Sequence, residues 1–425
     1  MNWNSAECCN VAGALAMQAS RAPDAVAIHF PTGLRNGTVR YDECRYADLN
    51  DLSDRFARGL HEYGIGRGAR VALMVPPGLD FFALFFALFK AGCVPVLIDP
   101  GIGLGPLKQC LATAAPEAFI GITRAQAARA VMRWAPKSIH RLVTIGPRLG
   151  WGGISSNQLE SMGQRSSGAM LTRTRPGEMA AILFTSGSTG IPKGVVYRHR
   201  HFTAQVSMLQ QAFGIEAGEV DLPTFPPFAL FDPALGMTTV IPWMDPTRPA
   251  RANPRLLVQA IERFGVTNLF GSPALLKVLS GHTEAEQITL GSVRRVISAG
   301  AAVPIPTVRA MQRALRPEAR VFTPYGATEC LPVAAVHGGE LDEQVAAMTH
   351  AGEGICVGQP VPPNRVVILP IRDAAIERLD EEQLMPTGVT GEIAVNGPTT
   401  TDAYWQLEEQ TQLAKVGDNR GRIWH

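Results

Sequence analysis

The stretch that decides the fold is ILFTSGSTGIPKGVV, residues 182–196, in which an apolar run is followed by hydroxyl-bearing residues, glycines and one lysine. The apolar run predicts a strand, and the glycines allow the following loop to approach a ligand closely. Backbone amides, hydroxyls and the positive charge of Lys193 all suit phosphate oxygens. The stretch therefore predicts a phosphate-binding loop, with an ordinary Gly/Ser surface loop as the alternative.

The order of residues in this loop differs from that of a Walker A loop. A Walker A loop requires Gly, Lys and Ser or Thr in direct succession. Here Pro192 stands before Lys193 and Gly194 follows it, and the proline stiffens the exit of the loop. A kinase-type phosphate loop is therefore disfavoured.

Short apolar runs alternate with stretches of helical character along the chain. This alternation predicts an α/β fold with mostly parallel sheets. Several runs end in Gly, Ser, Thr or Pro, at the carboxyl ends of strands, where ligands bind in such sheets. The expected strands span residues 70–76, 94–100, 180–186, 266–272 and 294–300.

Composition describes a globular chain without a polyelectrolyte partner. The 425 residues are 46% hydrophobic and 18% charged, enough for a large core in two or three subdomains. Lys and Arg number 39 against 37 Asp and Glu, with a net charge of +2 and no basic block, so we expect no nucleic-acid partner. Seven scattered cysteines without a C-x-x-C pair favour a reducing compartment.

Two apolar segments bear on the location of the protein. Residues 1–20 have no basic region ahead of their apolar residues, so they do not predict a secretory signal. The run FFALFFALF, residues 81–89, lies between Asp80 and Lys90 and is too short to cross a bilayer as a helix. We expect a buried core helix there, and a cytoplasmic protein that does not span a membrane.

The chain divides into three predicted parts. A Gly- and Ser-rich segment, residues 146–178, predicts a linker, with a boundary near residue 175. From about residue 351, short strands with Pro and Gly turns predict a β-rich subdomain. The predicted parts are a first α/β subdomain (1–175), a second that carries the nucleotide motifs (176–350), and the β-rich part (351–425).

Residues 185–194 resemble throughout the signature loop of the adenylate-forming superfamily, which includes acyl-CoA synthetases, adenylation domains and luciferase. Two further signatures follow in order. ISAGAAVP, residues 297–304, resembles the adenine-pocket turn of that superfamily, and TPYGATE, residues 323–329, resembles its Tyr-Gly-x-Thr-Glu motif. The resemblance implies two α/β subdomains plus a small β-rich subdomain, with ATP and Mg²⁺ as cofactors.

The resemblance also implies roles for individual residues. Tyr325 would stack on adenine, Thr328 would contact the α-phosphate, and Glu329 would hold magnesium, an ion that prefers hard oxygen ligands. Catalytic roles are implied for Thr185, Lys193, Thr328 and Glu329. The implied nucleotide-binding residues are Thr185, Ser186, Gly187, Ser188, Thr189, Gly190, Lys193, Gly300, Ala301, Ala302, Tyr325, Gly326, Ala327 and Thr328.

An apolar, aromatic segment at residues 223–254 is the candidate acyl pocket. Many acyl-CoA synthetases carry a histidine beside the acyl group where this chain has Ala229. A long alkyl chain and ordinary core packing explain the apolar residues of the segment equally well. The candidate pocket residues are Phe228, Ala229, Leu230, Phe231, Met237 and Trp243.

Nearly the whole chain resembles bacterial olefin β-lactone synthetases. The resemblance implies that a long-chain 2-alkyl-3-hydroxy fatty acid is activated as its acyl adenylate, and that its own 3-hydroxyl then closes a β-lactone, with possible assembly among other enzymes of olefin biosynthesis. A long-chain fatty acyl-CoA ligase is the first alternative, and a non-catalytic nucleotide-binding module is the second. Intact Lys193, Thr328 and Glu329 argue against the second.

The last residues, NRGRIWH (419–425), resemble those just before a ribose-binding aspartate in the superfamily, for which Asp418 is a candidate substitute. The superfamily continues into a mobile C-terminal domain with the catalytic lysine of adenylation. We therefore expect these 425 residues alone to bind ATP weakly and turn over slowly.

Overall fold

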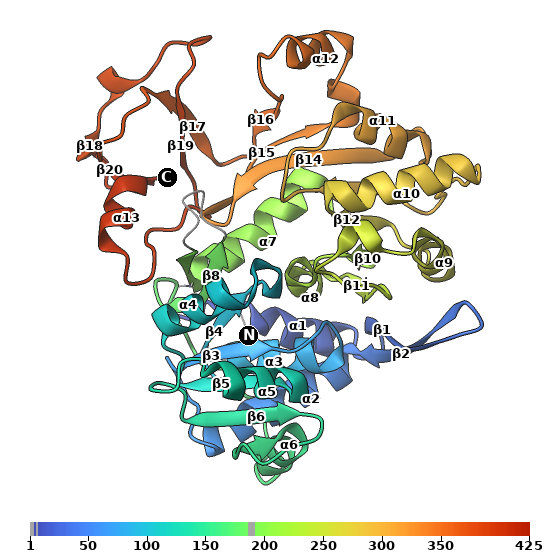
Figure 1. Ribbon diagram of the computed structural model, residues 1–425, viewed down its shortest axis with the longest axis vertical. Helices are drawn as coiled ribbons and strands as arrows, with labels where there is room; N and C mark the ends of the chain where they lie inside the picture. The colour runs from blue at the N-terminus through green and yellow to red at the C-terminus, as the bar shows by residue number, and fades with distance from the viewer. Residues whose placement is uncertain (1–3, 6, 186–191) are drawn as a thin grey trace.

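Residues 4–5, 7–185 and 192–425 are described in a computed structural model of the chain. Figure 1 shows two large sheets one above the other, each flanked by helices, and a smaller β-rich part beside the upper sheet. The fold is α/β with mostly parallel sheets, as predicted, and the five predicted strands correspond to β3, β4, β8, β12 and β13.

The lower sheet has seven strands in the order β7-β6-β5-β3-β4-β8-β9. All neighbours pair in parallel except β8 and β9, which form an antiparallel pair around the phosphate loop. The strands are β3 (Arg70–Met74), β4 (Val94–Ile98), β5 (Ala118–Ile122), β6 (Arg141–Ile145), β7 (Ile154–Ser155), β8 (Met179–Thr185) and β9 (Lys193–Arg198).

The upper sheet has nine strands in the order β16-β15-β14-β13-β12-β10-β11-β1-β2. Its central strands are parallel, and antiparallel strands close both edges. The strands are β1 (Val26–Arg35), β2 (Thr38–Arg45), β10 (Val220–Pro223), β11 (Thr238–Val240), β12 (Asn268–Gly271), β13 (Arg295–Ser298), β14 (Arg320–Ala327), β15 (Cys330–His337) and β16 (Gln359–Pro360).

The C-terminal part is β-rich, as predicted. It contains a two-stranded sheet of β17 and β19 and a three-stranded sheet of β18, β20 and β21. These strands are β17 (Arg365–Leu369), β18 (Arg378–Leu379), β19 (Glu392–Asn396), β20 (Val416–Asp418) and β21 (Ile423–Trp424).

Helices cover both large sheets in the described parts of the chain (Figure 1). Those around the lower sheet are α2 (Tyr46–Glu62), α3 (Leu79–Lys90), α4 (Leu104–Ala114), α5 (Thr123–Met132) and α6 (Ser156–Gly163). Those around the upper sheet are α7 (His199–Phe213), α9 (Pro254–Phe264), α10 (Pro273–Ala285), α11 (Ile305–Arg313) and α12 (Glu343–His350). The others are α1 (Ala12–Arg21), α8 (Asp232–Leu235) and α13 (Glu408–Ala414).

Helix α3 confirms the prediction of a buried core helix. Every residue from Phe81 to Lys90 is buried. A helix that is apolar on all sides must be surrounded, because each exposed face would leave apolar area in water. The buried Lys90 ammonium lies 2.7 Å from the Asp54 carboxylate, so its charge is paired.

Strands from each side of the boundary predicted near residue 175 join the sheet that is formed mainly by strands from the other side. β1 and β2 join the upper sheet, where Ile28 of β1 pairs with Thr239 of β11, whereas β8 and β9 join the lower sheet. The predicted linker also contains a helix, α6, whose first turn is closed by reciprocal hydrogen bonds between Ser155 and Gln158. The division of the chain into three subdomains stays a prediction.

Candidate active site

The predicted phosphate loop lies in sequence between β8, which ends at Thr185, and β9, which begins at Lys193. Thr185 and Lys193 are backbone partners across this antiparallel pair, so the two ends of the loop are held together. Ser186, Gly187, Ser188, Thr189 and Gly190 lie outside the described residues, and their predicted roles stay predictions.

The two adenine motifs lie side by side at one end of the upper sheet. Strands β13 and β14 pair in parallel, with Ile297 opposite Phe322, so the residues after them meet at the same edge. Gly300 has φ +91°, which a residue with a side chain rarely adopts. Ala301 and Ala302 are exposed beside it, with Tyr325, Gly326 and Ala327 exposed on β14.

Glu329 lies at the turn between β14 and β15, and its carboxylate is largely buried. The Tyr404 hydroxyl donates a hydrogen bond of 2.7 Å to Glu329 Oε1. Burial and the neighbouring Glu329 raise the pKa of Tyr404, so its phenol stays a proton donor. Oε2 of Glu329 has no hydrogen bond to any described residue, which leaves one carboxylate oxygen for a further ligand.

Two lysines flank the ring of Tyr404. The Lys193 ammonium lies 5.2 Å from the ring centroid and the Lys415 ammonium 5.8 Å from it. Burial lowers the pKa of Lys415 to about 8, against the charges of Glu329 and Asp402. Two cations and one carboxylate therefore converge on one aromatic ring, beside the predicted phosphate loop.

The segment before Tyr404 joins the two sheets. Thr401 donates two hydrogen bonds to the Glu329 carbonyl, from its amide at 2.8 Å and from its hydroxyl at 2.9 Å. The Trp405 amide donates to the Gly194 carbonyl at the start of β9. Tyr197 of β9 in turn donates to the Thr328 carbonyl at 2.6 Å. Lys193, Thr328 and Glu329 are thus held together by contacts between the sheets.

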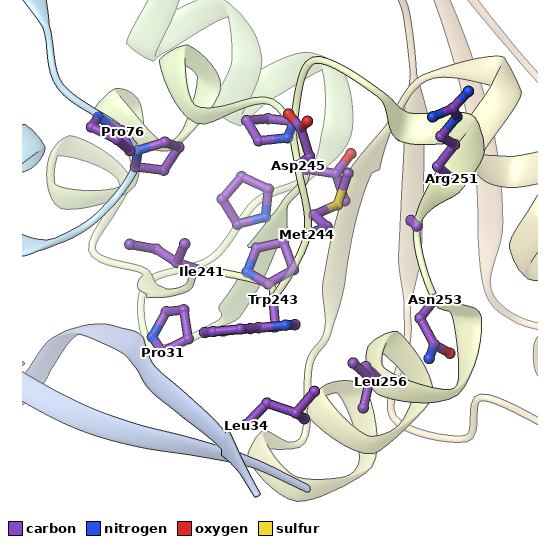
Figure 2. Close-up of a pocket in the computed structure, with 16 residues that line it drawn as sticks. Pro31, Leu34, Pro76, Ile241, Trp243, Met244, Asp245, Arg251, Asn253 and Leu256 are labelled. Atoms are coloured by element: carbon purple, nitrogen blue, oxygen red, sulfur yellow. The ribbon is translucent and has the colours of Figure 1, made fainter. Parts of the chain in front are cut away.

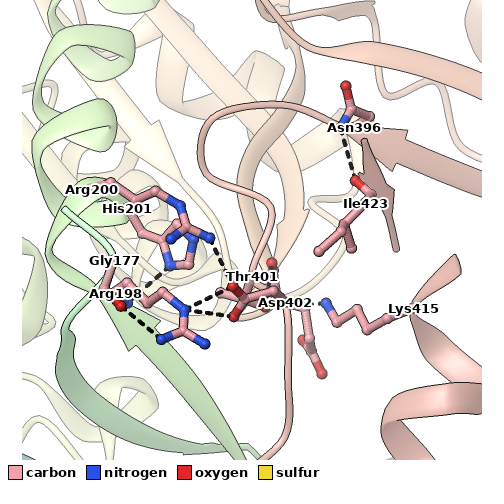
Figure 3. A network of polar contacts seen from close by, with 10 residues as sticks. Gly177, Arg198, Arg200, His201, Asn396, Thr401, Asp402, Lys415 and Ile423 are labelled. Atoms are coloured by element: carbon pink, nitrogen blue, oxygen red, sulfur yellow. Dashed lines mark hydrogen bonds and ion pairs between the residues drawn. The ribbon is translucent and has the colours of Figure 1, made fainter. Parts of the chain in front are cut away.

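An ion-pair network fixes this segment (Figure 3). Asp402 lies 2.7 Å from Arg198 Nε and 2.8 Å from Arg200 Nη2. Burial alone would raise the pKa of Asp402, but hydrogen bonds from the two arginines outweigh burial and hold that pKa below its ordinary value. Lys415 Nζ reaches Thr401 Oγ1 at 3.1 Å on the other side of the segment.

The carboxylate of Asp418, the candidate ribose ligand, makes its hydrogen bonds to residues that follow it closely in sequence. Its carboxylate accepts hydrogen bonds from Arg422 Nε at 2.6 Å, from Trp424 Nε1 at 3.0 Å and from the amides of Arg420 and Arg422. These bonds hold the pKa of Asp418 well below its ordinary value although burial works the other way. The geometry assigns Asp418 to the turn between β20 and β21.

A small cavity lies directly behind the adenine motifs. Its volume is about 50 Å³, and Ala299 and Pro324 from the two motifs form part of its wall. Aromatic and aliphatic side chains form most of the rest, including Phe228, which stacks on Phe270 with 3.8 Å between ring centroids. Its polar lining residues are Asp221, Asp232 and Asn268.

A much larger cavity has a volume of about 670 Å³, and Pro223 at the end of β10 is among its lining residues. Figure 2 shows Trp243 and Ile241 facing Pro31 and Leu34 of the β1 strand across it. Six prolines are among its lining residues: Pro31, Pro76, Pro77, Pro223, Pro242 and Pro246. Thr224 lines the large cavity, and its amide and hydroxyl both donate hydrogen bonds to the carbonyl of Phe270, a residue that lines the small cavity.

The predicted acyl-pocket residues do not all lie at the same cavity. Phe228, Phe231 and Met237 line the small cavity, and Ala229 and Leu230 are buried beside them in the same core. Trp243 does not join them: it lines the large cavity and is 39% exposed.

Sequence reasoning missed Thr401, Asp402, Tyr404 and Lys415. A signal was present, because TTTDAYW, residues 399–405, places hydroxyl, carboxylate and aromatic residues directly after a strand. Which charges they would meet depends on contacts more than 70 residues apart, such as that of Tyr404 with Glu329.

No group of three or more His, Cys, Asp or Glu in the described parts of the chain has the arrangement of a metal site. Within the same residues, no helix is long and apolar enough to cross a membrane.

Comparison with known proteins agrees with this geometry. The chain is 54% identical over 424 residues to an olefin β-lactone synthetase of Stenotrophomonas maltophilia, covering 98% of this chain and 76% of that one. A second olefin β-lactone synthetase, from Xanthomonas campestris, is also 54% identical and is covered to 75%. A long-chain-fatty-acid–CoA ligase of Escherichia coli is 24% identical, over 88% of this chain and 68% of that one.

A solved long-chain-fatty-acid–CoA ligase of Archaeoglobus fulgidus has the same fold. It superposes with a TM-score of 0.79 at 19% identity, over 98% of this chain and 80% of that one. Residues 15–405 match the family described as AMP-binding enzyme, which is more than nine-tenths of the chain. The chain therefore belongs to the AMP-binding enzyme family, with two olefin β-lactone synthetases among its relatives.

Proposed function

We propose that this protein converts a long-chain 2-alkyl-3-hydroxy fatty acid and ATP into a β-lactone, AMP and pyrophosphate. The observation that carries the proposal is the 54% identity, over 98% of the chain, to two olefin β-lactone synthetases. The identity to a fatty acyl-CoA ligase is less than half as high.

In the first half-reaction the substrate carboxylate attacks the α-phosphate of ATP. Two anions must approach each other, so positioning and charge neutralisation supply most of the catalysis. Lys193 and Lys415 provide positive charge near the ring of Tyr404, and the amides of the loop after Thr185 are the proposed phosphate donors. Tyr325, exposed beside Gly300, is the proposed stacking partner of adenine.

Magnesium is part of the proposal and fits Glu329. Mg²⁺ is commonly held by one or two carboxylates together with substrate phosphates, so a single glutamate suffices. Glu329 Oε1 is taken by Tyr404, and the second oxygen is open. A bound Mg²⁺ would neutralise phosphate charge at this position. Tyr404 holds the carboxylate in one orientation for that purpose.

In the second half-reaction the 3-hydroxyl oxygen of the substrate attacks its own activated carbonyl carbon. A bond forms between that oxygen and the carbonyl carbon, and the bond from this carbon to the phosphate oxygen breaks, so that AMP leaves. The hydroxyl is already attached to the acyl group, so its effective concentration is high. The small cavity beside Ala299 is the proposed place of this step, and the large cavity offers room for an alkyl chain.

The test uses full-length protein with ATP, magnesium and a 2-alkyl-3-hydroxy fatty acid, with and without coenzyme A, and identifies the products by mass spectrometry. β-Lactone and AMP formed without coenzyme A are the expected result. A thioester formed only with coenzyme A would instead make the protein an acyl-CoA ligase. Neither product, with ATP bound, would favour a nucleotide-binding module.

Assembly with other enzymes of olefin biosynthesis and a cytoplasmic location complete the proposal. Both rest on the resemblance to olefin β-lactone synthetases.

A further inference from the structure

Asp232 is a buried acid without a counter-charge. It stands at the start of α8, directly after Phe231, and is 3% exposed. Its only side-chain hydrogen bond among the described residues is from the Thr239 hydroxyl, which donates to Oδ2 at 2.6 Å. No Lys, Arg or His of the described residues pairs with it. Burying an unpaired carboxylate is costly, so an aspartate retained there needs an explanation beyond packing.

Asp221, the other acid in the small cavity, has a structural explanation. It accepts a hydrogen bond from Asn268 Nδ2, and the Arg295 guanidinium that contacts Asn268 also pairs with Glu219. The polar chain from Asp221 to Glu219 therefore includes a cation and runs along the strands β10, β12 and β13. Asp232 stands outside this chain, with Asp221 as its charged neighbour.

The cavity brings Asp232 to the predicted acyl site. Ala299 and Pro324, which belong to the two adenine motifs, line the same cavity as Asp232. Leu331 and Pro332, which follow Glu329 on β15, also line the cavity. An acyl group attached to the α-phosphate of a nucleotide on these motifs would extend into this cavity. The 3-hydroxyl, two carbons from the carbonyl, would then enter an apolar space with few polar partners.

We propose that the Asp232 carboxylate accepts the proton of the substrate's 3-hydroxyl as that oxygen attacks the acyl-adenylate carbonyl. This assignment rests on the function proposed above. The proton passes from the hydroxyl to Asp232 Oδ1, the oxygen–carbon bond closes the four-membered ring, and AMP leaves with the electrons of the broken carbon–oxygen bond. Asp232 ends protonated and returns its proton to solvent when the lactone departs.

The surroundings of Asp232 suit a base. Burial, and then the charge of Asp221, raise the pKa of Asp232 well above its ordinary value, against the Thr239 hydrogen bond. A raised pKa makes the carboxylate, once it is deprotonated, a stronger proton acceptor. The hydrogen bond from Thr239 fixes one oxygen and leaves the other free. Thr239 is thus a positioning residue.

The experiment separates the two half-reactions in the Asp232→Asn variant of the full-length protein. Adenylation is followed by pyrophosphate–ATP exchange with a 2-alkyl-3-hydroxy acid and with the matching 2-alkyl acid that has no hydroxyl. Lactone formation is followed by mass spectrometry. We expect exchange within about 3-fold of wild type for both acids and a loss of lactone formation of about 100-fold or more, because general-base catalysis contributes about 10²–10⁴-fold.

Two control variants test whether the loss of lactone formation is specific to Asp232. Asp24→Asn makes the same chemical change at an exposed position far from the cavity and should leave both half-reactions unchanged. Asp221→Asn changes the other acid of the cavity and should lower lactone formation less than Asp232→Asn does.

The outcomes are distinct. Lactone formation within 3-fold of wild type in Asp232→Asn would overturn the assignment. An equal loss of exchange with both acids would also overturn it, because the change would then act on acyl binding. If wild type itself yields a thioester and no lactone, the result contradicts the proposed function and, with it, the role of Asp232 as the base.

Discussion

The two cavities differ in volume and in the side chains that line them. The large one, about 670 Å³, is walled by six prolines, by other apolar side chains that include the 39% exposed Trp243, and by the polar residues Thr224, Asp245, Arg251 and Asn253. The small one, about 50 Å³, holds two buried acids among aromatic rings. Burying a carboxylate costs far more than lining a surface with proline, so the demanding chemistry lies in the smaller space.

Under the proposed function, the large cavity provides volume for the alkyl chain, and the small cavity provides the side chain that reacts. A long alkyl chain needs room and no particular partner, which proline-rich walls provide without unsatisfied amide donors. A hydroxyl that must lose its proton needs a fixed acceptor in a place without competing water.

The largest expected effect comes from filling the small cavity. Ala299→Trp adds more side-chain volume than about 50 Å³ can hold, so the acyl group loses its place. We expect kcat/KM for adenylation to fall about 100-fold for short and long acids alike, as overpacking by about 2–3 kcal/mol implies. Pyrophosphate–ATP exchange measures this loss. An unchanged exchange rate would contradict the placement of the acyl group in the small cavity.

The same substitution in the large cavity is the matched comparison. Ala252 lines that cavity, which has room for an indole ring. We expect Ala252→Trp to raise KM for acids with long alkyl chains about 10-fold, the equivalent of 1.4 kcal/mol, while short-chain acids are unaffected. A series of acids of increasing chain length shows this dependence. Equal effects at every length would contradict an alkyl role for the large cavity.

A smaller effect is expected from Thr239→Val, which removes the hydrogen bond to Asp232 and keeps the shape of the side chain. That hydrogen bond favours the charged carboxylate and lowers its pKa, so its loss raises the pKa of Asp232. A base works when deprotonated, so the rise of lactone formation with pH should move to higher pH by about 0.7 unit, for a bond of about 1 kcal/mol. The pH profile of adenylation should stay in place.

Much of the fold could be predicted because its signals are local. Apolar runs such as residues 94–100 and the all-apolar helix around Phe85 depend on their own composition for secondary structure and burial. The exchange of β1 and β8 between the sheets could not be predicted in this way. Strand partners are chosen by packing over long separations, as Ile28 opposite Thr239 illustrates.

The same difference between local signals and long-range packing applies to the candidate site. The adenine motifs could be proposed from the sequence because glycines and small residues in a fixed order indicate a backbone requirement, as Gly300 does with its positive φ, and their role stays a prediction. That Trp243 lines a different cavity from Phe228 could not be predicted, since an aromatic residue in an apolar segment gives no indication of which cavity it lines. Asp232 gave no signal either: its significance comes from being buried without a cation, which only the neighbours of a side chain reveal.

The smallest effect concerns stability and separates a functional Asp232 from a structural one. Burial raises the folded-state pKa of Asp232 above its ordinary value of 3.8, so folding favours the protonated form. Its contribution to stability is therefore fully present below about pH 4 and is lost as pH rises through the raised pKa. Asparagine carries no charge at any of these pH values.

Asp232→Asn should therefore match wild type in stability near pH 4 and exceed it by about 1 kcal/mol at pH 8, as expected when an uncompensated buried charge is removed. Urea unfolding of both proteins at the two pH values measures the difference. A variant less stable than wild type at both pH values would show that the aspartate itself stabilises the fold and would contradict this expectation. Gain of stability together with loss of lactone formation is the pattern of a residue retained for chemistry at the expense of the fold.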